Sequence, residues 1–230
     1  MQKNIFLNVK QLLKIGVYFN SKQQYNQRVL NNLFVGYRQK MAIYHYDVLI
    51  EYFLLIRVFI FNVLRRDGSI LFYDDSKRFE HLMAFYAPLL NQQVLLGRWV
   101  PGTFTNYSLL QHTRLTSGVQ ITKIPDLIFY FNVYDNDVLL KEAFSYDIPV
   151  LSIIDANSKF LFYYTYVLPG NKQSYKFVIF IFYLISYYIF KYSKMVFQKT
   201  PKKVGNKQAE RMINVYYTKA LSQLKFEKLI

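Results

Sequence analysis

The chain has 230 residues, of which 53% are hydrophobic, a mean hydropathy of +0.05 and a formal net charge of +15. These values suit one domain with a large core, and they exclude both wholesale disorder and a polytopic membrane protein. With no cysteine in the sequence, disulfides, thiolate-bound zinc, iron–sulfur clusters and thiol catalysis are excluded as well.

The first third of the chain predicts two helices separated by an irregular segment. Residues 4–15 have apolar positions at helical spacing and stop at Gly16, so a short helix is expected there. Residues 17–42 are polar and rich in Asn and Gln, and we expect them to be irregular. Residues 45–64 have apolar positions every three or four residues and predict an amphipathic helix.

The middle of the chain predicts alternating strands and helices. Residues 69–73 form a short β-type run, and the Asp74-Asp75-Ser76 cluster caps a helix that ends near Leu90. Two apolar strands, 126–133 and 148–154, flank a helix at 137–146. Continuous apolar strands joined by a ten-residue helix indicate a βαβ crossover in a parallel sheet that is buried on both faces.

A further strand at 163–167 precedes the apolar run Phe177–Phe190, and the chain ends in a possible helix at 208–229. The uncharged run has 14 residues, which is short for a membrane span and typical of a buried helix. The predicted fold is therefore α/β, with an open, doubly wound, mainly parallel sheet flanked by helices. We expect an α/β core at 41–195 as a single domain, without stable membrane insertion.

The basic charge is confined to the two ends of the chain. Residues 1–40 carry seven basic and no acidic side chains, residues 41–190 carry twelve of each, and residues 191–230 carry ten basic and two acidic. Basic N- and C-terminal extensions, 1–40 and 196–230, are typical of polyanion binding, since phosphate neutralisation releases counterions. Two other interpretations stay open: the lysines keep the chain soluble, or they bind an anionic membrane surface.

The amino-acid composition also indicates what kind of genome encodes the protein. Tyrosine and phenylalanine number 22 and 21, whereas the chain has 8 glycines and 1 tryptophan. Packing does not require such a ratio, and we interpret it as the codon bias of an A+T-rich genome, as in an organelle. The N-terminus has neither the Arg- and Ser-rich pattern of a transit peptide nor a secretory signal, so we expect an organelle-encoded protein.

Polar residues that follow the predicted strands are the candidates for an active site, because open parallel sheets bind ligands beyond their carboxyl ends. Carboxylates and amides there could bind a metal or act as acid and base. Ordinary helix caps and turns use the same residue types, and this is the interpretation that we favour. The candidates are Asp74, Asp75, Asn132, Asp135, Asp155 and Asn157.

Signatures of nucleotide and metal chemistry are missing from the sequence. It has neither glycine-rich phosphate loop, no Gly-x-Ser-x-Gly turn, and no pair of histidines at helical spacing. His45, His81 and His112 are far apart along the chain. The sequence therefore predicts no catalytic, cofactor-binding or metal-binding residue and no small-molecule substrate.

Several motifs occur in a fixed order in the second half of the chain. Residues 98–106 read Arg-Trp-Val-Pro-Gly-Thr-Phe-Thr-Asn, and residues 124–128 read Ile-Pro-Asp-Leu-Ile. Glu-Ala follows at 142–143, Asp-Ile-Pro-Val at 147–150, Ile-Asp-Ala-Asn at 154–157 and Leu-Pro-Gly-Asn at 168–171. In this order and spacing, the motifs resemble those of the small-subunit ribosomal protein 2 family, universal ribosomal protein S2. The resemblance covers about residues 10–190.

The resemblance implies a parallel α/β domain on the outer face of the small ribosomal subunit, between head and body. Members of the family contact small-subunit rRNA and neighbouring ribosomal proteins without known catalysis. Bacterial members insert a long helical hairpin before the strand that begins near Pro125, whereas only Tyr107–Lys123 fill that interval here. We therefore expect the fold to lack the coiled-coil insertion.

Basic residues of the two extensions and of the Arg-Trp motif are the candidates for rRNA phosphate contacts, because Arg binds phosphate bidentately and Lys acts as a point charge. They are Lys10, Lys14, Lys22, Arg28, Arg38, Lys40, Arg98, Lys202, Lys203 and Lys207. The motif residues are expected to hold the fold. They are Trp99, Gly102, Thr105, Asn106, Pro149, Asp155, Asn157, Pro169, Gly170 and Asn171.

The motifs, the basic ends and the composition predict a structural constituent of the small ribosomal subunit, located in the mitochondrial matrix and without a cofactor or enzymatic activity. Two alternatives stay open. A nucleotide-dependent α/β enzyme would bind its ligand near Asp155, and a peripheral membrane protein would be retained on washed membranes.

Overall fold

The computed structural model of the chain describes most of the predicted core. The described residues are 19–22, 33–39, 41–75, 77–107, 121, 123–131, 137–155, 158 and 161–199. The helices expected at 4–15 and 208–229 lie outside these residues, as does most of the interval in which bacterial relatives carry their insertion.

A five-stranded parallel sheet forms the centre of the fold, in the order β5-β4-β6-β7-β8. Every residue of β4, β6 and β7 is buried, which explains why these strands read as unbroken apolar runs in the sequence. The order reverses between β4 and β6, as in a doubly wound sheet, so the predicted fold class is confirmed. The strands are β4 Ile70–Tyr73, β5 Gln93–Leu95, β6 Leu127–Tyr130, β7 Val150–Ile154 and β8 Tyr166–Pro169.

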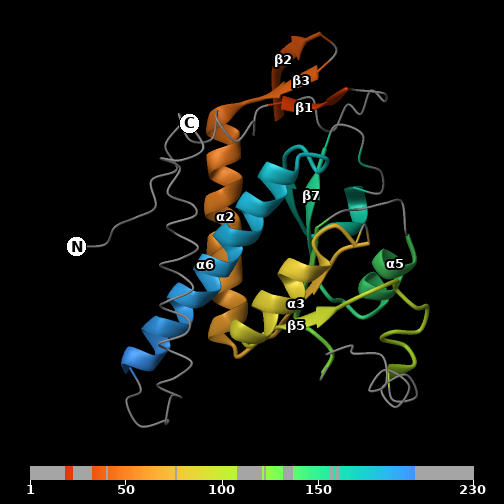
Figure 1. Ribbon diagram of the computed structural model, residues 1–230, viewed down its shortest axis with the longest axis vertical. Coiled ribbons are helices and arrows are strands. Elements are labelled where there is room, and N and C mark those ends of the chain that lie inside the picture. Colours follow the sequence, from red (N-terminus) through yellow and green to blue (C-terminus); the bar gives the residue numbers. More distant parts are fainter. Residues whose placement is uncertain are drawn as a thin grey trace.

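Helices cover both faces of this sheet (Figure 1). On one face, α6 (Tyr175–Lys199) lies between α3 (Glu80–Leu89) and α2 (Tyr46–Arg65), with ring contacts from Tyr86 to Phe182 and from Phe53 to Phe180. On the other face lie α5 (Asp137–Ser145) and the short 3₁₀ helix η2 (Leu161–Tyr163). The α2 and α6 helices match the two apolar segments that the sequence predicts.

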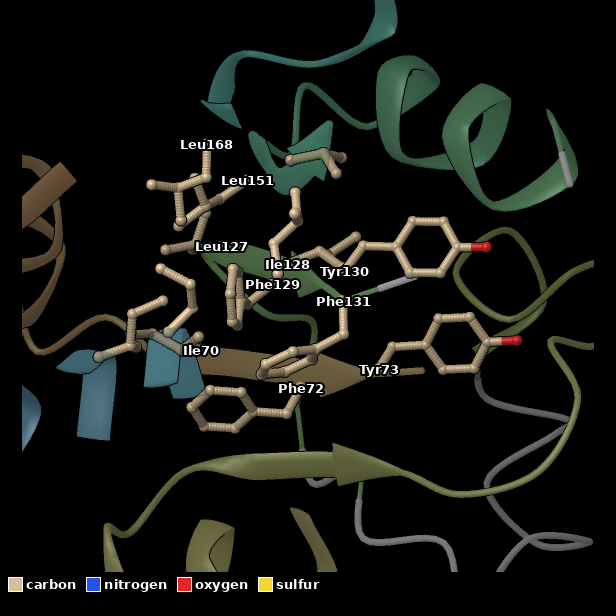
Figure 2. Packing of buried hydrophobic residues seen from close by; sticks show 14 of the residues in the cluster. Ile70, Phe72, Tyr73, Leu127, Ile128, Phe129, Tyr130, Phe131, Leu151 and Leu168 are labelled. Carbon is tan, nitrogen blue, oxygen red and sulfur yellow. The ribbon is translucent and has the colours of Figure 1, made fainter. Parts of the chain in front are cut away.

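The core is unusually aromatic, and its rings meet mostly edge to face. Phe72 contacts Phe129 at a centroid distance of 6.1 Å and an interplanar angle of 83°, and it contacts Phe182 of α6 at 5.8 Å. Figure 2 shows the rings of Phe72 and Phe129 from the neighbouring strands β4 and β6, with Phe131 lying beside Phe129. Edge-to-face pairs add about 0.5–1.5 kcal/mol to the burial of each ring, so an aromatic-rich sequence can still fill a core well.

A second, antiparallel sheet precedes α2, in the order β1-β3-β2. Its strands are β1 Phe19–Lys22, β2 Phe34–Arg38 and β3 Met41–Tyr44, so the prediction that residues 17–42 are irregular is wrong for these strands. Each strand has only four or five residues, too few for a clear alternation of apolar and polar positions. The Tyr44 hydroxyl donates a hydrogen bond to the carbonyl of Ile154 (3.3 Å), which places the small sheet over the carboxyl end of β7.

Two other details differ from the sequence prediction. The strand expected at 163–167 is β8, which begins at Tyr166, because η2 takes up the preceding apolar residues. The strand β5 was not predicted, since three residues carry no measurable periodicity.

Candidate functional site

The carboxyl edge of the parallel sheet, where the strands end, is the first place to look for a ligand. Asp74 follows β4, is fully buried, and accepts a hydrogen bond from the backbone N–H of Phe79 (3.1 Å) at the start of α3. Asp75 accepts one from the Tyr73 hydroxyl (3.0 Å). Asp74 thus ties the loop after β4 to the residue that precedes α3, but neither aspartate caps the helix as expected, because its N-cap is Phe79. The other candidates Asn132, Asp135 and Asn157 lie outside the described residues.

Asp155, at the end of β7, forms a buried polar cluster. Its carboxylate accepts a hydrogen bond from the Ser158 hydroxyl (2.9 Å), and that hydroxyl accepts one from the Asp155 backbone N–H (2.9 Å). The ammonium of Lys172 lies 3.7 Å from the same carboxylate, with side-chain exposures of 17% for Lys172 and 1% for Asp155. The cluster therefore joins the end of β7 to the segment between β8 and α6.

The Arg-Trp motif forms a turn that is tied to α5. The backbone N–H groups of Gly102 and Phe104 both donate to the carboxylate of Glu142, the second at 3.3 Å. Trp99 is buried against Phe104, with ring centroids 5.0 Å apart, and its backbone N–H donates to the Tyr73 hydroxyl (2.9 Å). Two motifs that are 40 residues apart in sequence, Arg-Trp and Glu-Ala, thus hold each other in place.

Gly102 is required by the geometry of this turn. Its φ of +88° lies in the left-handed region, which a side chain with a Cβ adopts only at a cost. Thr103 is fully buried and donates a hydrogen bond from its hydroxyl to the carbonyl of Val100 (2.6 Å). Thr105 and Asn106 are exposed on the same turn, where Arg98 is exposed as well.

The Leu-Pro-Gly-Asn motif shapes the junction between β8 and α6. Pro169 ends β8, and Gly170 donates its N–H to the carbonyl of Ile154 (2.9 Å). A Cβ on Gly170 would lie 2.1 Å from two atoms of the Phe177 ring, so only glycine fits there. Asn171 accepts a hydrogen bond from the N–H of Gln173 (2.9 Å) through its side-chain oxygen, which forms the turn before the helix.

Tyrosine hydroxyls at the carboxyl edge are held in their neutral form. Figure 2 shows Tyr73 and Tyr130 side by side, with their hydroxyls pointing the same way. Burial, with a contribution from the nearby Asp75 carboxylate, raises the pKa of both phenols well above that of an ordinary tyrosine. Both phenols therefore stay protonated at neutral pH, and neither is poised to act as a base.

On the face of the sheet that α2, α3 and α6 cover, burial also raises the pKa of two further tyrosines. Burial raises the pKa of Tyr86 in α3 to about 12, and it raises the pKa of Tyr188 in α6 to about 12. The positive charge of Arg57 partly offsets the effect at Tyr188. Both phenols are therefore neutral at pH 7 and belong to the packing between helices.

The predicted phosphate contacts are only partly placed by the structure. Arg38 is exposed at the end of β2, and Arg98 is exposed on the Arg-Trp turn. Lys22 belongs to β1. The remaining basic candidates lie outside the described residues. They are Lys10, Lys14, Arg28, Lys40, Lys202, Lys203 and Lys207.

The amino edge of the sheet carries two arginines that the sequence prediction left out. Arg65 and Arg66 end α2 and are exposed beside a cavity of about 720 Å³. Asp126 lies in the same wall, where it accepts a hydrogen bond from the N–H of Ser69 (2.7 Å) and faces the Lys123 ammonium at 3.6 Å. The cavity is lined by Phe59, Asn62, Val63, Arg65, Arg66, Gly68, Asp126 and Pro149. The sequence shows two adjacent arginines at 65 and 66, but no motif around them indicates a function.

Histidine and carboxylate side chains do not gather into a metal site in the part of the chain that is described. His45 is exposed before α2, with its Nδ1 atom 3.9 Å from the Asp47 carboxylate, and His81 is exposed on α3. His112 lies outside the described residues.

Comparison with known proteins matches this chain to one family. The family described as ribosomal protein S2 matches residues 12–117 and 110–191. The small ribosomal subunit protein uS2 of Colwellia psychrerythraea is 23% identical over 204 residues, which cover 73% of this chain and 84% of that protein. The match spans both sheets and the motif turns described above. The chain therefore belongs to the ribosomal protein S2 family.

Proposed function

We propose that this chain is a structural constituent of the small subunit of a mitochondrial ribosome, where its basic residues bind rRNA and its folded core abuts neighbouring proteins. A structural role in the small ribosomal subunit follows from membership of the family. The observation that carries it is the family match, which runs through almost the whole described fold. The buried carboxylates at the carboxyl edge support the same role, because the described ones are engaged in turns and helix starts.

The rRNA contacts are assigned to exposed basic side chains on several elements. Arg38, Arg98, Arg65 and Arg66 are exposed on the described fold, and each can bind a phosphate without reading sequence. We assign the same role to the two extensions, 1–40 and 196–230, around a core at 41–195; the first limit falls in the turn between β2 and β3. Their candidates are Lys10, Lys14, Lys22, Arg28, Lys40, Lys202, Lys203 and Lys207.

The double variant Arg38→Gln/Arg98→Gln is expected to weaken binding to small-subunit rRNA and to make it less sensitive to salt. Two lost phosphate contacts lower the slope of log K against log salt by about 2, because fewer counterions are released. Filter binding across a salt series measures this slope. Lys77→Gln, which removes one exposed cation outside the assigned set, is the control, and a slope that falls as much per charge there contradicts the assignment.

The mitochondrial location is supported by the composition, since 22 tyrosines and 21 phenylalanines fit an A+T-rich organelle genome. Mass spectrometry of ribosomes from purified mitochondria and from the cytosol of the same cells tests it. Peptides of this chain are expected in the mitochondrial small subunit only. Their presence in cytosolic small subunits would overturn the location while leaving the ribosomal role intact.

A further inference from the structure

The cavity beside the end of α2 has two kinds of wall, one apolar and one basic. Phe59, Val63 and Pro149 belong to the apolar part, and Arg65 and Arg66 form the basic part. The cavity volume of about 720 Å³ is in the range of sites that hold organic ligands, roughly 300–1,000 Å³. Such a lining suits a ligand that joins a flat apolar group to an anion.

Packing holds the aromatic part of the wall in place. The Phe59 ring stacks on Tyr166 of β8, with ring centroids 3.9 Å apart and an interplanar angle of 29°. Phe59 is only half-buried, so part of its side chain stays accessible from the cavity that it lines. A fixed aromatic ring is the kind of surface on which an unpaired base stacks, because every base has a flat π face.

The two arginines lie on a turn whose backbone is fixed. The N–H groups of Arg66 and Gly68 both donate to the carbonyl of Val63, at 3.2 and 3.0 Å. A Cβ on Gly68 would lie 2.7 Å from that carbonyl oxygen, so the turn closes tightly on the helix. The N–H of Ser69 then donates to the Asp126 carboxylate (2.7 Å), and the N–H of Asp126 donates to the carbonyl of Ser69 (2.9 Å). A backbone fixed in this way lowers the entropy that a ligand must offset on binding.

The charged side chains of the cavity have capacity left for a ligand. Within the described residues, no carboxylate forms an ion pair with Arg65 or Arg66. The contacts that the described residues make with the Asp126 carboxylate go to Oδ2, which the Lys123 ammonium faces at 3.6 Å. Two cations and one carboxylate make the lining net basic, and the formal charges of Lys123 and Asp67 just outside it balance.

We propose that this cavity binds an unpaired nucleotide of RNA. Its phosphate lies on Arg65 and Arg66, and its base lies against Phe59 and Pro149. The Oδ1 atom of Asp126 accepts a hydrogen bond from an amino group of the base, as carboxylates do from N4 of cytosine. This inference rests on the proposed function, to which it adds a site for a single-stranded segment of the rRNA.

Two other anionic partners match the lining less well. The carboxylates of an acidic peptide would lie close to Asp126, which repels them, and they would leave the aromatic wall unused. Base-paired RNA keeps its bases stacked, so it would use the arginines alone. An unpaired nucleotide uses the basic, the aromatic and the carboxylate parts of the lining together, and the observations therefore favour it.

Binding of labelled hexacytidine and hexauridine to the full-length protein, followed by fluorescence anisotropy, tests the site. Hexacytidine is expected to bind about fivefold more tightly, because uracil has no exocyclic amino group for Asp126. Phe59→Leu is expected to weaken hexacytidine binding about tenfold, since the stacking surface is lost. The matched control is Phe61→Leu, also at a half-buried position of α2 but packed on Tyr188 of α6, and it should leave the affinity unchanged.

Ultraviolet cross-linking of hexacytidine to the wild-type chain gives a second measurement, which does not depend on how the variants fold. The cross-link is expected in the tryptic peptide Val58–Arg65, which contains Phe59. Equal affinities for the two oligonucleotides would overturn the proposal. Equal effects of the two Phe variants, or cross-links confined to other peptides, would overturn it as well.

Two further outcomes separate the alternatives. If hexaglutamate displaced hexacytidine from this peptide as well as unlabelled hexacytidine does, the cavity would belong to an acidic protein segment and the proposal would be wrong. If the nucleotide site failed while the protein still bound an rRNA hairpin, the proposed function would stand. That function would fail if the full-length protein bound none of these RNAs.

Discussion

Replacing Gly170 with alanine is expected to lower the free energy of unfolding by about 3 kcal/mol, because the new methyl group has no room. Its Cβ would lie 2.1 Å from the Cε1 and Cζ atoms of Phe177, whose ring is fully buried in the first turns of α6. Relief requires α6 to shift against β8 or the ring to leave its rotamer. The midpoint of urea unfolding, followed by circular dichroism, measures the loss.

Gly36→Ala is the matched control, because a Cβ at Gly36 meets nothing within 4 Å. It is expected to change stability by no more than about 0.5 kcal/mol. The double variant Gly170→Ala/Phe177→Leu separates the collision from other effects. Its loss should be smaller than the sum of the two single losses, since the smaller side chain makes room for the methyl group. Equal losses at Gly170 and Gly36 would refute the role of this close approach.

Removing the charge of Lys172 is expected to destabilise the fold by about 2–4 kcal/mol, because the buried Asp155 carboxylate loses an attraction that offsets the cost of its burial. That carboxylate is 1% exposed and lies 3.7 Å from the Lys172 ammonium. The hydroxyl of Ser158 also donates a hydrogen bond to this carboxylate, and a bond from a neutral hydroxyl does not replace a positive charge. Lys172→Met keeps the length of the side chain, and thermal unfolding of the purified variant reports the loss.

Lys176→Met, at an exposed position in the first turn of α6, is the control and is expected to leave stability unchanged. Adding Asp155→Asn to Lys172→Met should recover much of the loss, because the amide keeps the shape without the charge. If the double variant lost as much as the two single variants together, the ion pair would not be the source of the effect.

The sequence was most informative where a segment is long or buried on every side. The 20-residue helix α2 and the fully buried strands β4, β6 and β7 follow from apolar spacing alone. The small antiparallel sheet could not be derived from the sequence, because its strands are short and exposed positions in them are apolar as well. In β2, for example, Val35 is 66% exposed, so apolar character does not mark the buried side.

The contacts that hold the motifs together could not be derived from spacing. Glu142 binds backbone N–H groups of Gly102 and Phe104, and Lys172 reaches back to Asp155; both pairings depend on how the strands are ordered. The prediction that Asp155 belongs to a turn agrees with its hydrogen bonds to Ser158, but the sequence did not predict its ion pair with Lys172. Arg65 and Arg66 could not be predicted as a candidate site from the sequence, because their position beside a cavity depends on Asp126 and Pro149, far along the chain.

Sedimentation of tagged, full-length protein from lysed mitochondria tests most directly whether the chain is part of a small ribosomal subunit. In moderate salt, it is expected to travel with small-subunit rRNA through a sucrose gradient, and nuclease treatment should move it to the top. A higher salt concentration should release the protein from the rRNA, because the free energy gained by releasing counterions falls as salt rises. A chain that stays at the top of the gradient in moderate salt, or that floats with membranes after carbonate washing, would contradict the account.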